Sequence, residues 1–297
     1  MSAQVSPAMA RRYPLTMVCE VTGVARSSVY AAAAPSSLEP PAKRGPKTPH
    51  TDAEVLGAIR QVIGESRFHG EGYRKIHARL KVLKGIRVGA KRVLRLMRQA
   101  GLLAPVREPR RRGNVVHDGT IVRSLPEQMW GTDAARFQTE AEDWCWFFFG
   151  IDHCVGDIVG WNASKSGNRF EALLPIQAAV RKCFGSVGPD VARGLKLRMD
   201  HGPQYTSDDF VGTVKYLGIG LSYAFVQEPQ CNGIAERFVR TLKDQVLHVY
   251  RFKDLTEAKR IIGEFIERFN REWRMERHGY RTLAEVRASL QEQKGAA

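Results

Sequence analysis

The spacing of apolar residues predicts a small helical unit near the start of the chain, over residues 1–34. Within residues 12–34, Gly23 can turn the chain between two short helices, and Ser27 can cap the second of them. This pattern is typical of a helix-turn-helix, although helices that only pack together would show it too. The inner face of the first helix is predicted to hold Leu15, Val18, Cys19 and Val21.

A second helical unit is predicted over residues 51–104. Five prolines between 35 and 50 separate it from the first unit as a stiff linker. Gly101 is placed to end its last helix, and a basic linker with two prolines follows at 105–123. Helical spacing relates Val55, Ile59, Val62 and Ile63, then Tyr73, Ile76 and Leu80, and then Val93, Leu96 and Met97.

From residue 124 onward the pattern changes to strands. Runs rich in β-branched and aromatic residues predict strands at 129–137, 144–152, 158–164, 195–199 and 219–225. Helical spacing predicts helices at 170–184, after a capping Ser207, and at 233–249. The order predicts an α/β core over 124–250, a five-stranded mixed sheet with helices on both faces, and a helical extension over 251–297.

Positive charge is concentrated in the second helical unit. The chain has 297 residues, a net charge of +15 and a pI of about 9.9. Between Glu71 and Arg112 there are 14 Lys and Arg residues against two acids, which leaves only +3 for the rest of the chain. Such a block predicts binding to DNA or RNA, with a solvated basic surface as the alternative. On the last helix of the unit, the cations outside the apolar stripe are Lys91, Arg92, Arg95 and Arg98, which can face phosphates.

The cysteines and the longest apolar run favour a cytoplasmic protein without a membrane partner. The five cysteines are odd in number and form no C-x-x-C pair, which argues against both a disulfide framework and a zinc site. The longest apolar run, at 144–151, is too short to span a bilayer. The first residues also lack the apolar segment of a signal peptide.

Three acids stand in distinctive strings: Asp133 in W-G-T-D, Asp200 in R-M-D-H-G-P-Q-Y, and Glu236 in C-N-G-I-A-E-R-F. In the predicted layout, strands one and four bring the two aspartates together and the following helix delivers the glutamate. Converging carboxylates repel one another unless they share protons or bind cations, and their hard oxygens suit Mg²⁺ or Mn²⁺. Two such ions about 3.5–4 Å apart can serve in-line phosphoryl displacement. The acids therefore predict an enzyme that acts on a nucleic-acid backbone.

Each of these acids also has an ordinary structural explanation. Asp133 can be an ordinary polar residue of an edge strand. Asp200 can be only a turn residue. Glu236 shares a helix face with Arg240 and Lys243, so it can form a surface ion-pair ladder. The interval of 35 residues between Asp200 and Glu236 favours the catalytic interpretation.

Other polar residues compete for a place in the site. Asp157 resembles a turn residue, whereas Asp152 ends an apolar strand and can orient the site without binding metal. His201 is predicted to contact DNA or to support the site rather than to bind metal.

Together these strings resemble the catalytic subunits of bacterial insertion-sequence transposases, the second-reading-frame type within the retroviral-integrase-like DDE superfamily. The resemblance covers nearly all of the chain. Besides the acid strings it includes a basic residue seven positions after Glu236, at Lys243, and the strings G-Y-R-K-I at 72–76, R-V-L-R-L-M at 92–97 and F-N-R-E-W-R at 269–274. Relatives commonly differ at His201, Pro203 and Cys231, but these differences remove no carboxylate.

The resemblance implies an RNase H-like core in which Asp133, Asp200 and Glu236 bind two Mg²⁺ or Mn²⁺ ions. Water and then a 3′-hydroxyl would attack, first cutting the ends of an insertion element and then joining them to a target. Lys243 would contact the transposon end. The further predicted DNA contacts are Arg240, Arg74 and Lys75.

The resemblance also implies double-stranded DNA as the partner and a homo-oligomer in the active complex. No leucine heptad is visible, so a separate helix-turn-helix or coiled-coil protein from an upstream frame, as in relatives, stays open. Two other functions remain as alternatives. One is a non-catalytic DNA-binding regulator, and the other is a nuclease of the same fold that only hydrolyses, including RNA–DNA hybrids.

Overall fold

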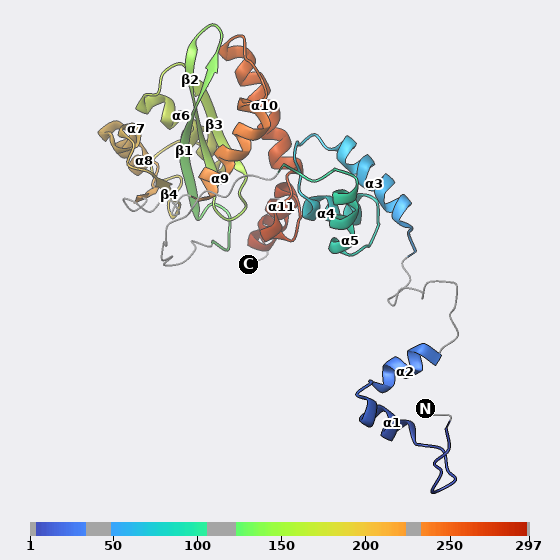
Figure 1. Ribbon diagram of the computed structural model, residues 1–297. Helices are drawn as coiled ribbons and strands as arrows, with labels where there is room; N and C mark the ends of the chain where they lie inside the picture. The colour runs from blue at the N-terminus through green and yellow to red at the C-terminus, as the bar shows by residue number, and fades with distance from the viewer. Residues whose placement is uncertain (1–3, 34–48, 106–122, 224–232, 296–297) are drawn as a thin grey trace. The chain divides into compact units, whose positions relative to one another are not determined.

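The computed structural model describes residues 4–33, 49–105, 123–223 and 233–295 (Figure 1). It divides the chain into two compact units, Met1–Pro49 and His50–Ala297. The second unit holds both the second helical unit and the sheet, so these two parts share one body. The predicted linkers at 35–50 and 105–123 fall almost entirely outside the described residues. None of the helices in the described ranges has the length and apolar content needed to cross a membrane.

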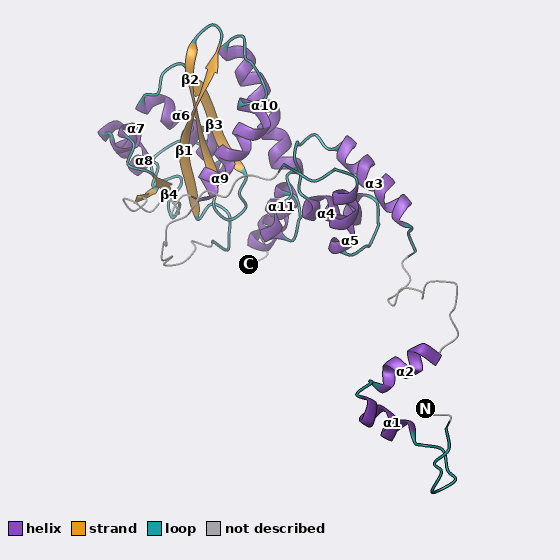
Figure 2. Cartoon of the chain, in the orientation of Figure 1, coloured by secondary structure: helices purple, strands orange, loops and turns teal. Residues whose placement is uncertain are grey.

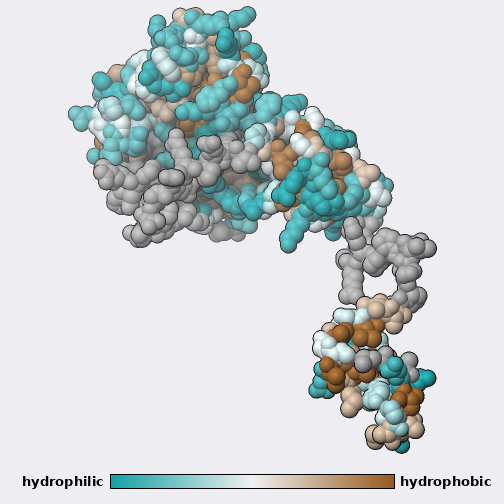
Figure 3. Space-filling view, viewed as in Figure 1, coloured by the Kyte–Doolittle hydropathy of each residue, from teal (hydrophilic) through white to brown (hydrophobic). Residues whose placement is uncertain are grey.

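Two short helices, α1 (Leu15–Thr22) and α2 (Arg26–Ala33), form the first unit. Gly23 ends α1 as predicted, with a φ of 69° that glycine adopts without strain. The predicted cap at Ser27 is wrong, because α2 begins at Arg26 and contains Ser27. The inner position of Val21 is also wrong, since 81% of this residue is exposed. Two helices this short offer little surface for burial, and apolar residues remain prominent on this unit in Figure 3.

The second unit begins with three helices, α3 (Asp52–Glu65), α4 (Tyr73–Leu83) and α5 (Ala90–Gln99). Thr51 and Glu54 form a reciprocal capping box at the start of α3, where each side chain accepts the backbone N–H of the other residue. Gly101, with a φ of 67°, follows the end of α5 as predicted. The predicted inner faces are confirmed by a common core of Val55, Ile59, Val62, Ile76, Leu80, Val93, Leu96 and Met97.

The five predicted strands form one mixed sheet with the order β3-β2-β1-β4-β5. β1 pairs antiparallel with β2, and β2 pairs antiparallel with β3. β1 pairs parallel with β4, and β4 pairs parallel with β5, so strands one and four are neighbours as predicted. The strands are β1 (Met129–Thr139), β2 (Asp143–Asp152), β3 (Ile158–Ser164), β4 (Lys196–Met199) and β5 (Gly220–Tyr223).

Helices cover both faces of this sheet, which confirms the predicted fold class (Figure 2). On one face, α6 (Arg169–Phe184) and α8 (Asp208–Tyr216) bury Trp130 of β1. On the other face, α9 (Gly233–Leu242) and α10 (Leu255–Glu272) bury Phe137 of the same strand. Gly160 allows α6 to approach β3 closely, since a Cβ at this position would lie 2.1 Å from the backbone oxygen of Pro175.

The structure divides the helix predicted over 233–249 into two consecutive elements, α9 and a π-helical turn. After α9 the chain continues as a π-helical turn, η2 (Lys243–Leu247), in which the N–H of His248 donates to the carbonyl of Lys243. A π turn widens the helix by one residue and rotates the side chains that follow it. The short elements α7 (Pro203–Thr206) and η3 (Glu276–His278) and the C-terminal helix α11 (Leu283–Gly295) complete the described chain.

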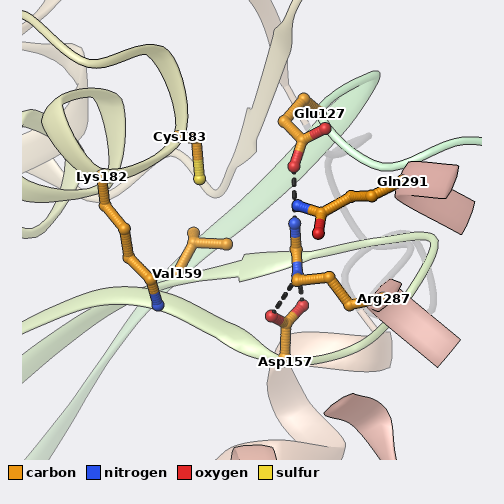
Figure 4. A pocket seen from close by; sticks show the side chains of 7 residues that line it. All are labelled: Glu127, Asp157, Val159, Lys182, Cys183, Arg287 and Gln291. Atoms are coloured by element: carbon orange, nitrogen blue, oxygen red, sulfur yellow. Dashed lines mark hydrogen bonds and ion pairs between the residues drawn. The ribbon is translucent and has the colours of Figure 1, made fainter. Parts of the chain in front are cut away.

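An ion-pair network joins α11 to the sheet (Figure 4). Arg287 donates through Nε and Nη2 to the two carboxylate oxygens of Asp157, at 2.7 and 2.8 Å, and through Nη1 to Glu127 at 2.6 Å. Asp152 is fully buried, and it accepts the backbone N–H of Glu127 and two N–H groups of the β2–β3 turn. The network thus fixes the segment that leads into β1.

Candidate active site

Asp133 lies in the middle of β1, on the sheet face that α9 and α10 cover. Side chains alternate along a strand, so Asp133 shares this face with Ala135 and Phe137, which pack into the core below these helices. One carboxylate oxygen of Asp133 accepts the N–H of Ala134 at 2.8 Å. The residue is half-buried, and its charge is therefore less screened than on an open surface.

Asp200 follows directly on β4, the parallel neighbour of β1. Its Oδ1 accepts the N–H of Gly202 at 2.9 Å, which forms the turn into α7. The turn interpretation is thus correct as local structure, but the residue is exposed and lies at the carboxyl end of a strand, where α/β sheets bind ligands. The ring of His201 stacks on Tyr223 at the end of β5, with 5.4 Å between the ring centres and an angle of 13°.

Glu236 lies in the first turn of α9 and is exposed. The buried face of this helix consists of Ala235, Phe238 and Leu242. Partial burial raises the pKa of Glu236, and the positive charge of Arg240, one turn further along the helix, opposes this rise. The helix therefore presents an acid and a cation together on its outer side, as the sequence pattern predicts.

Asp200 and Glu236 are near enough to Asp133 for their charges to act on it. Burial is the main cause that raises the pKa of Asp133 to about 6, and the negative charges of Asp200 and Glu236 contribute to the rise. The N–H of Ala134 and the positive charge of Lys243 oppose it. Side chains from β1, from the end of β4 and from α9 therefore share one electrostatic neighbourhood with excess negative charge.

The chemistry of these donors fits a hard divalent cation, because all three are carboxylates. A bound cation would also relieve the mutual repulsion that contributes to the raised pKa of Asp133. Within the described ranges, no three His, Cys, Asp or Glu side chains form a group that could hold one ion as they stand. Shared coordination would thus require the exposed side chains of Asp200 and Glu236 to turn toward Asp133.

The two competing acids belong to the Arg287 network. Asp157 pairs with Arg287 through both carboxylate oxygens, and Asp152 holds the β2–β3 turn through backbone N–H groups. Both roles are structural. The network borders a pocket of about 410 Å³. Among the described residues, the pocket is lined by Glu127, Asp157, Val159, Lys182, Cys183, Arg287 and Gln291, and by none of the three candidate acids (Figure 4).

A group of cations that the sequence pattern did not indicate lies around the buried His153. Together with burial, the positive charges of Arg198, Arg277 and Arg123 lower the pKa of His153 to about 4. Arg198 is only 5% exposed, and its Nη1 donates to Oγ of Ser222 on β5 at 3.1 Å. The string R-M-D was the available signal, because alternate residues of a strand share a face, which sets Arg198 beside Asp200.

The predicted phosphate-facing cations of α5 fall into two pairs. Arg92 and Arg95 both reach Asp52 at the start of α3, with nitrogen–oxygen distances of 2.7 Å. The hydrogen bond from Arg95, followed by the one from Arg92, lowers the pKa of Asp52. Lys91 and Arg98 are exposed on the same helix. The four contacts with DNA remain a prediction.

Arg74 and Lys75, at the start of α4, lie against the C-terminal part of the chain. Arg74 pairs with Glu276 at 2.8 Å on the surface. The Nζ atom of Lys75 lies 3.0 Å from the centre of the Trp273 ring, and burial lowers the pKa of Lys75 to about 7. Lys75 thus packs α4 against the core, whereas Arg74 forms an exposed ion pair, and contact of either residue with DNA stays a prediction.

Comparisons with known proteins find two family models. An HTH-like domain matches residues 50–110, and an integrase core domain matches residues 217–282. The transposase InsD of the insertion elements IS2A/D/F/H/I/K from Escherichia coli is 30% identical over 238 residues, which cover 77% of this chain and 76% of that relative. The likeness therefore extends over most of both proteins.

Similar solved structures are viral integrases. One is the simian T-cell lymphotropic virus intasome in complex with the PP2A regulatory subunit B56 gamma, with a TM-score of 0.47 and 15% identity over 80% of this chain and 74% of that chain. Another is the catalytic core domain of BIV integrase, with a TM-score of 0.40 and 17% identity over 57% of this chain and 98% of that chain.

Proposed function

The chain belongs to the insertion-sequence transposases of the integrase superfamily, and we propose that Asp133, Asp200 and Glu236 are the acids with which it transfers DNA strands. The observation that supports this proposal is that β1 and β4 are parallel neighbours, which sets Asp133 near Asp200, and that the charges of Asp200 and Glu236 both add to the raised pKa of Asp133. A purely structural role for each acid gives no reason for the charges of Asp200 and Glu236 to reach Asp133. The reaction is the cutting of the element's ends and their transfer to a target.

The acids would hold two divalent ions, Mg²⁺ or Mn²⁺. When bound, such ions neutralise charge on the transferring phosphate and activate the attacking hydroxyl. Asp133 would contribute to both ions, because it is the most buried of the three and is influenced by both other acids. Asp200 would complete the first ion site and Glu236 the second. The N–H of Ala134 orients one oxygen of Asp133 for this purpose.

Cations near the acids would hold the DNA backbone. The charge of Lys243 already reaches Asp133, so a phosphate in contact with Lys243 would lie close to the acids. Arg240 stands between Glu236 and Lys243 on α9 and extends the same positive edge. On the helical unit, Lys91 and Arg98 would contact phosphates away from the reaction site.

The working complex contains double-stranded DNA and at least two copies of the chain, because two element ends must be joined at one target. A separate protein from an upstream reading frame would add end recognition where the helical units of this chain are insufficient. We place this complex in the bacterial cytosol, on DNA.

The test uses a duplex that carries the DNA flanking the chain's own reading frame, together with a plasmid target. In Mg²⁺ the wild-type protein should nick this duplex and join its 3′ ends to the plasmid. Asp200→Asn should reduce joining by at least about 100-fold, because several kcal/mol of ion-dependent stabilisation are lost. Its affinity for the duplex should stay within about twofold, because no predicted phosphate contact has been removed.

Three results would contradict the proposal. Joining by Asp200→Asn at the wild-type rate would remove this residue from the reaction. Binding of the duplex without any reaction in Mg²⁺ or Mn²⁺ would indicate a regulator. Cleavage of an RNA–DNA hybrid without any joining would indicate a nuclease.

A further inference from the structure

The loop between α3 and α4 is inserted into the core of the sheet domain. Phe68 in this loop is 4% exposed and belongs to the same buried cluster as Phe265 of α10. Its ring meets Trp273 edge-on at 5.0 Å and Phe265 edge-on at 6.4 Å between centres. Edge-to-face packing of buried aromatic rings is directional as well as apolar. The helical unit at 50–105 is therefore anchored to the sheet domain in one orientation.

The residue after Phe68 makes a paired hydrogen bond with the turn that follows α9. The backbone N–H of His69 donates to Oε1 of Gln245 at 2.9 Å, and Nε2 of Gln245 donates to the carbonyl of His69 at 2.8 Å. A side-chain amide here satisfies both backbone groups of a single residue. The contact joins positions that are 176 residues apart in the sequence.

Gln245 lies on the same helical segment as the proposed catalytic glutamate. It belongs to the π turn η2, which directly continues α9, and it stands two residues after Lys243 and nine after Glu236. The widened turn sets the direction of its side chain relative to α9. A displacement of the loop at His69 would therefore act directly on the end of α9, which is the catalytic helix because it carries Glu236.

Polar contacts around Phe68 hold the loop itself in place. Glu71 accepts Oγ–H of Ser66 at 2.7 Å and pairs with Arg79 at 2.8 Å, and its side chain is only 3% exposed. Lys75 covers the ring of Trp273, which Phe68 also contacts. A loop that is fixed by buried ions and rings is rigid, so it moves together with the helical unit.

We propose that Gln245 is a positioning residue that couples the helical unit to the catalytic helix, so that DNA held by the helical unit sets the placement of Glu236 and hence the position of the cut. This inference rests on the proposed function, since Glu236 must be part of the reaction site. The contacts of the Gln245 amide in the described chain are with the backbone of His69. Its two hydrogen bonds act through α9.

The first experiment measures where the strand is cut. Wild type, Gln245→Ala, Gln245→Glu and the control Gln61→Ala react with the duplex carrying the DNA that flanks the reading frame, and cut positions are mapped to the nucleotide. Gln61 is a glutamine on α3 whose amide bonds only to Glu65 of its own helix in the described chain, so its loss removes the same atoms without touching the interface.

Gln245→Ala should lower the share of cuts at the main position by about fivefold, the low end of typical coupling between sites, and spread the rest over neighbouring nucleotides. Gln245→Glu keeps the acceptor for the N–H of His69 but loses the donor to the carbonyl of His69. Its share of cuts at the main position should therefore lie between those of the wild type and Gln245→Ala. Affinity for the duplex and the total number of nicks should stay within about twofold, because positioning and not binding is changed.

The second experiment does not depend on catalysis. Hydrogen–deuterium exchange is followed at residues 233–247 with and without a random-sequence duplex at low salt. In the wild type and in Gln61→Ala, DNA should slow exchange in this segment about threefold or more, and in Gln245→Ala the effect should disappear. If the wild type fails to cut, the proposed function fails, and the exchange data still decide the coupling.

Two results would overturn the inference. One is a cut distribution in Gln245→Ala that is the same as in the wild type. The other is DNA-dependent protection of residues 233–247 that does not need Gln245.

Discussion

Replacing Arg287 with methionine should lower the free energy of unfolding by about 3–5 kcal/mol at pH 7, the usual cost of removing one partner from a buried ion pair. Methionine keeps most of the volume of the side chain and removes the charge. The Arg287 side chain is 18% exposed, and the side chains of Asp157 and Glu127 that it pairs with are 7% and 10% exposed. Asp152, fully buried, lies 3.8 Å away. The substitution therefore leaves buried carboxylates without their cation.

The loss should be visible by thermal unfolding as well as in urea. At roughly 2–3 °C per kcal/mol for a chain of this size, Tm should fall by about 6–15 °C. The deficit should shrink toward pH 5, because carboxylates without a partner cation take up protons more readily and then carry no charge. Burial already raises the pKa of Asp152, which favours this uptake.

Arg193→Met is the matched control. Arg193 pairs with Asp190 on the surface with 77% of its side chain exposed, so its loss should change stability by less than about 0.5 kcal/mol. An Arg287→Met protein as stable as the wild type would refute the reasoning, since it would mean that backbone N–H groups alone satisfy these acids.

Three further predictions concern the metal site, the buried histidine and the DNA surface. Asp133→Asn should abolish joining, and it should also remove any rise of Tm that Mg²⁺ produces in the wild type without DNA. If the Mg²⁺-dependent rise of Tm is unchanged in this variant, Asp133 is not a ligand. His153 has a folded-state pKa of about 4, so its neutral form stabilises the fold above pH 6.5, and this contribution falls by about 2 kcal/mol on going to pH 5. His153→Gln should therefore lose less stability between pH 7 and pH 5 than the wild type, and an equally steep loss would contradict the assignment. Lys91→Ala with Arg98→Ala should reduce the salt slope of duplex binding by up to about 2 while Tm stays constant, and an unchanged slope would place α5 outside the DNA interface.

The sequence predicted the layers, the positions of the strands and the neighbouring of strands one and four, because the strands of this fold carry strong local patterns. The run over 144–152 is almost entirely aromatic and apolar, and β2 occupies Asp143–Asp152. The core of the second helical unit followed from apolar spacing in the same way. Where few residues are buried, the pattern carries less information, and the errors at Val21 and Ser27 occur in such a place.

The residues of the site were predictable to different degrees. Asp133, Asp200 and Glu236 stood out by their strings, and in the structure the charges of Asp200 and Glu236 act on Asp133. The pairing of Gln245 with His69 could not be predicted, because it depends on a π turn and on a contact across 176 residues. A single sequence has local periodicity but no direct record of such tertiary contacts.

The partners of the basic residues were likewise hidden in the sequence. Arg92 and Arg95 have the spacing of a phosphate-facing surface, yet both reach Asp52, which lies 40 or more residues earlier. Lys75 stands in a basic string, yet it covers the ring of Trp273. Charge density alone predicts attraction to DNA, whereas the part of that charge available to phosphates depends on packing.

The most direct test of the account is the location of Mn²⁺ in crystals of the protein bound to the duplex that flanks its reading frame. Anomalous scattering should show ions within about 2.0–2.3 Å of carboxylate oxygens from Asp133, Asp200 and Glu236, with the scissile phosphate beside them. Ions bound elsewhere, or the three carboxylates still apart with DNA in place, would contradict the assignment of these residues to strand transfer.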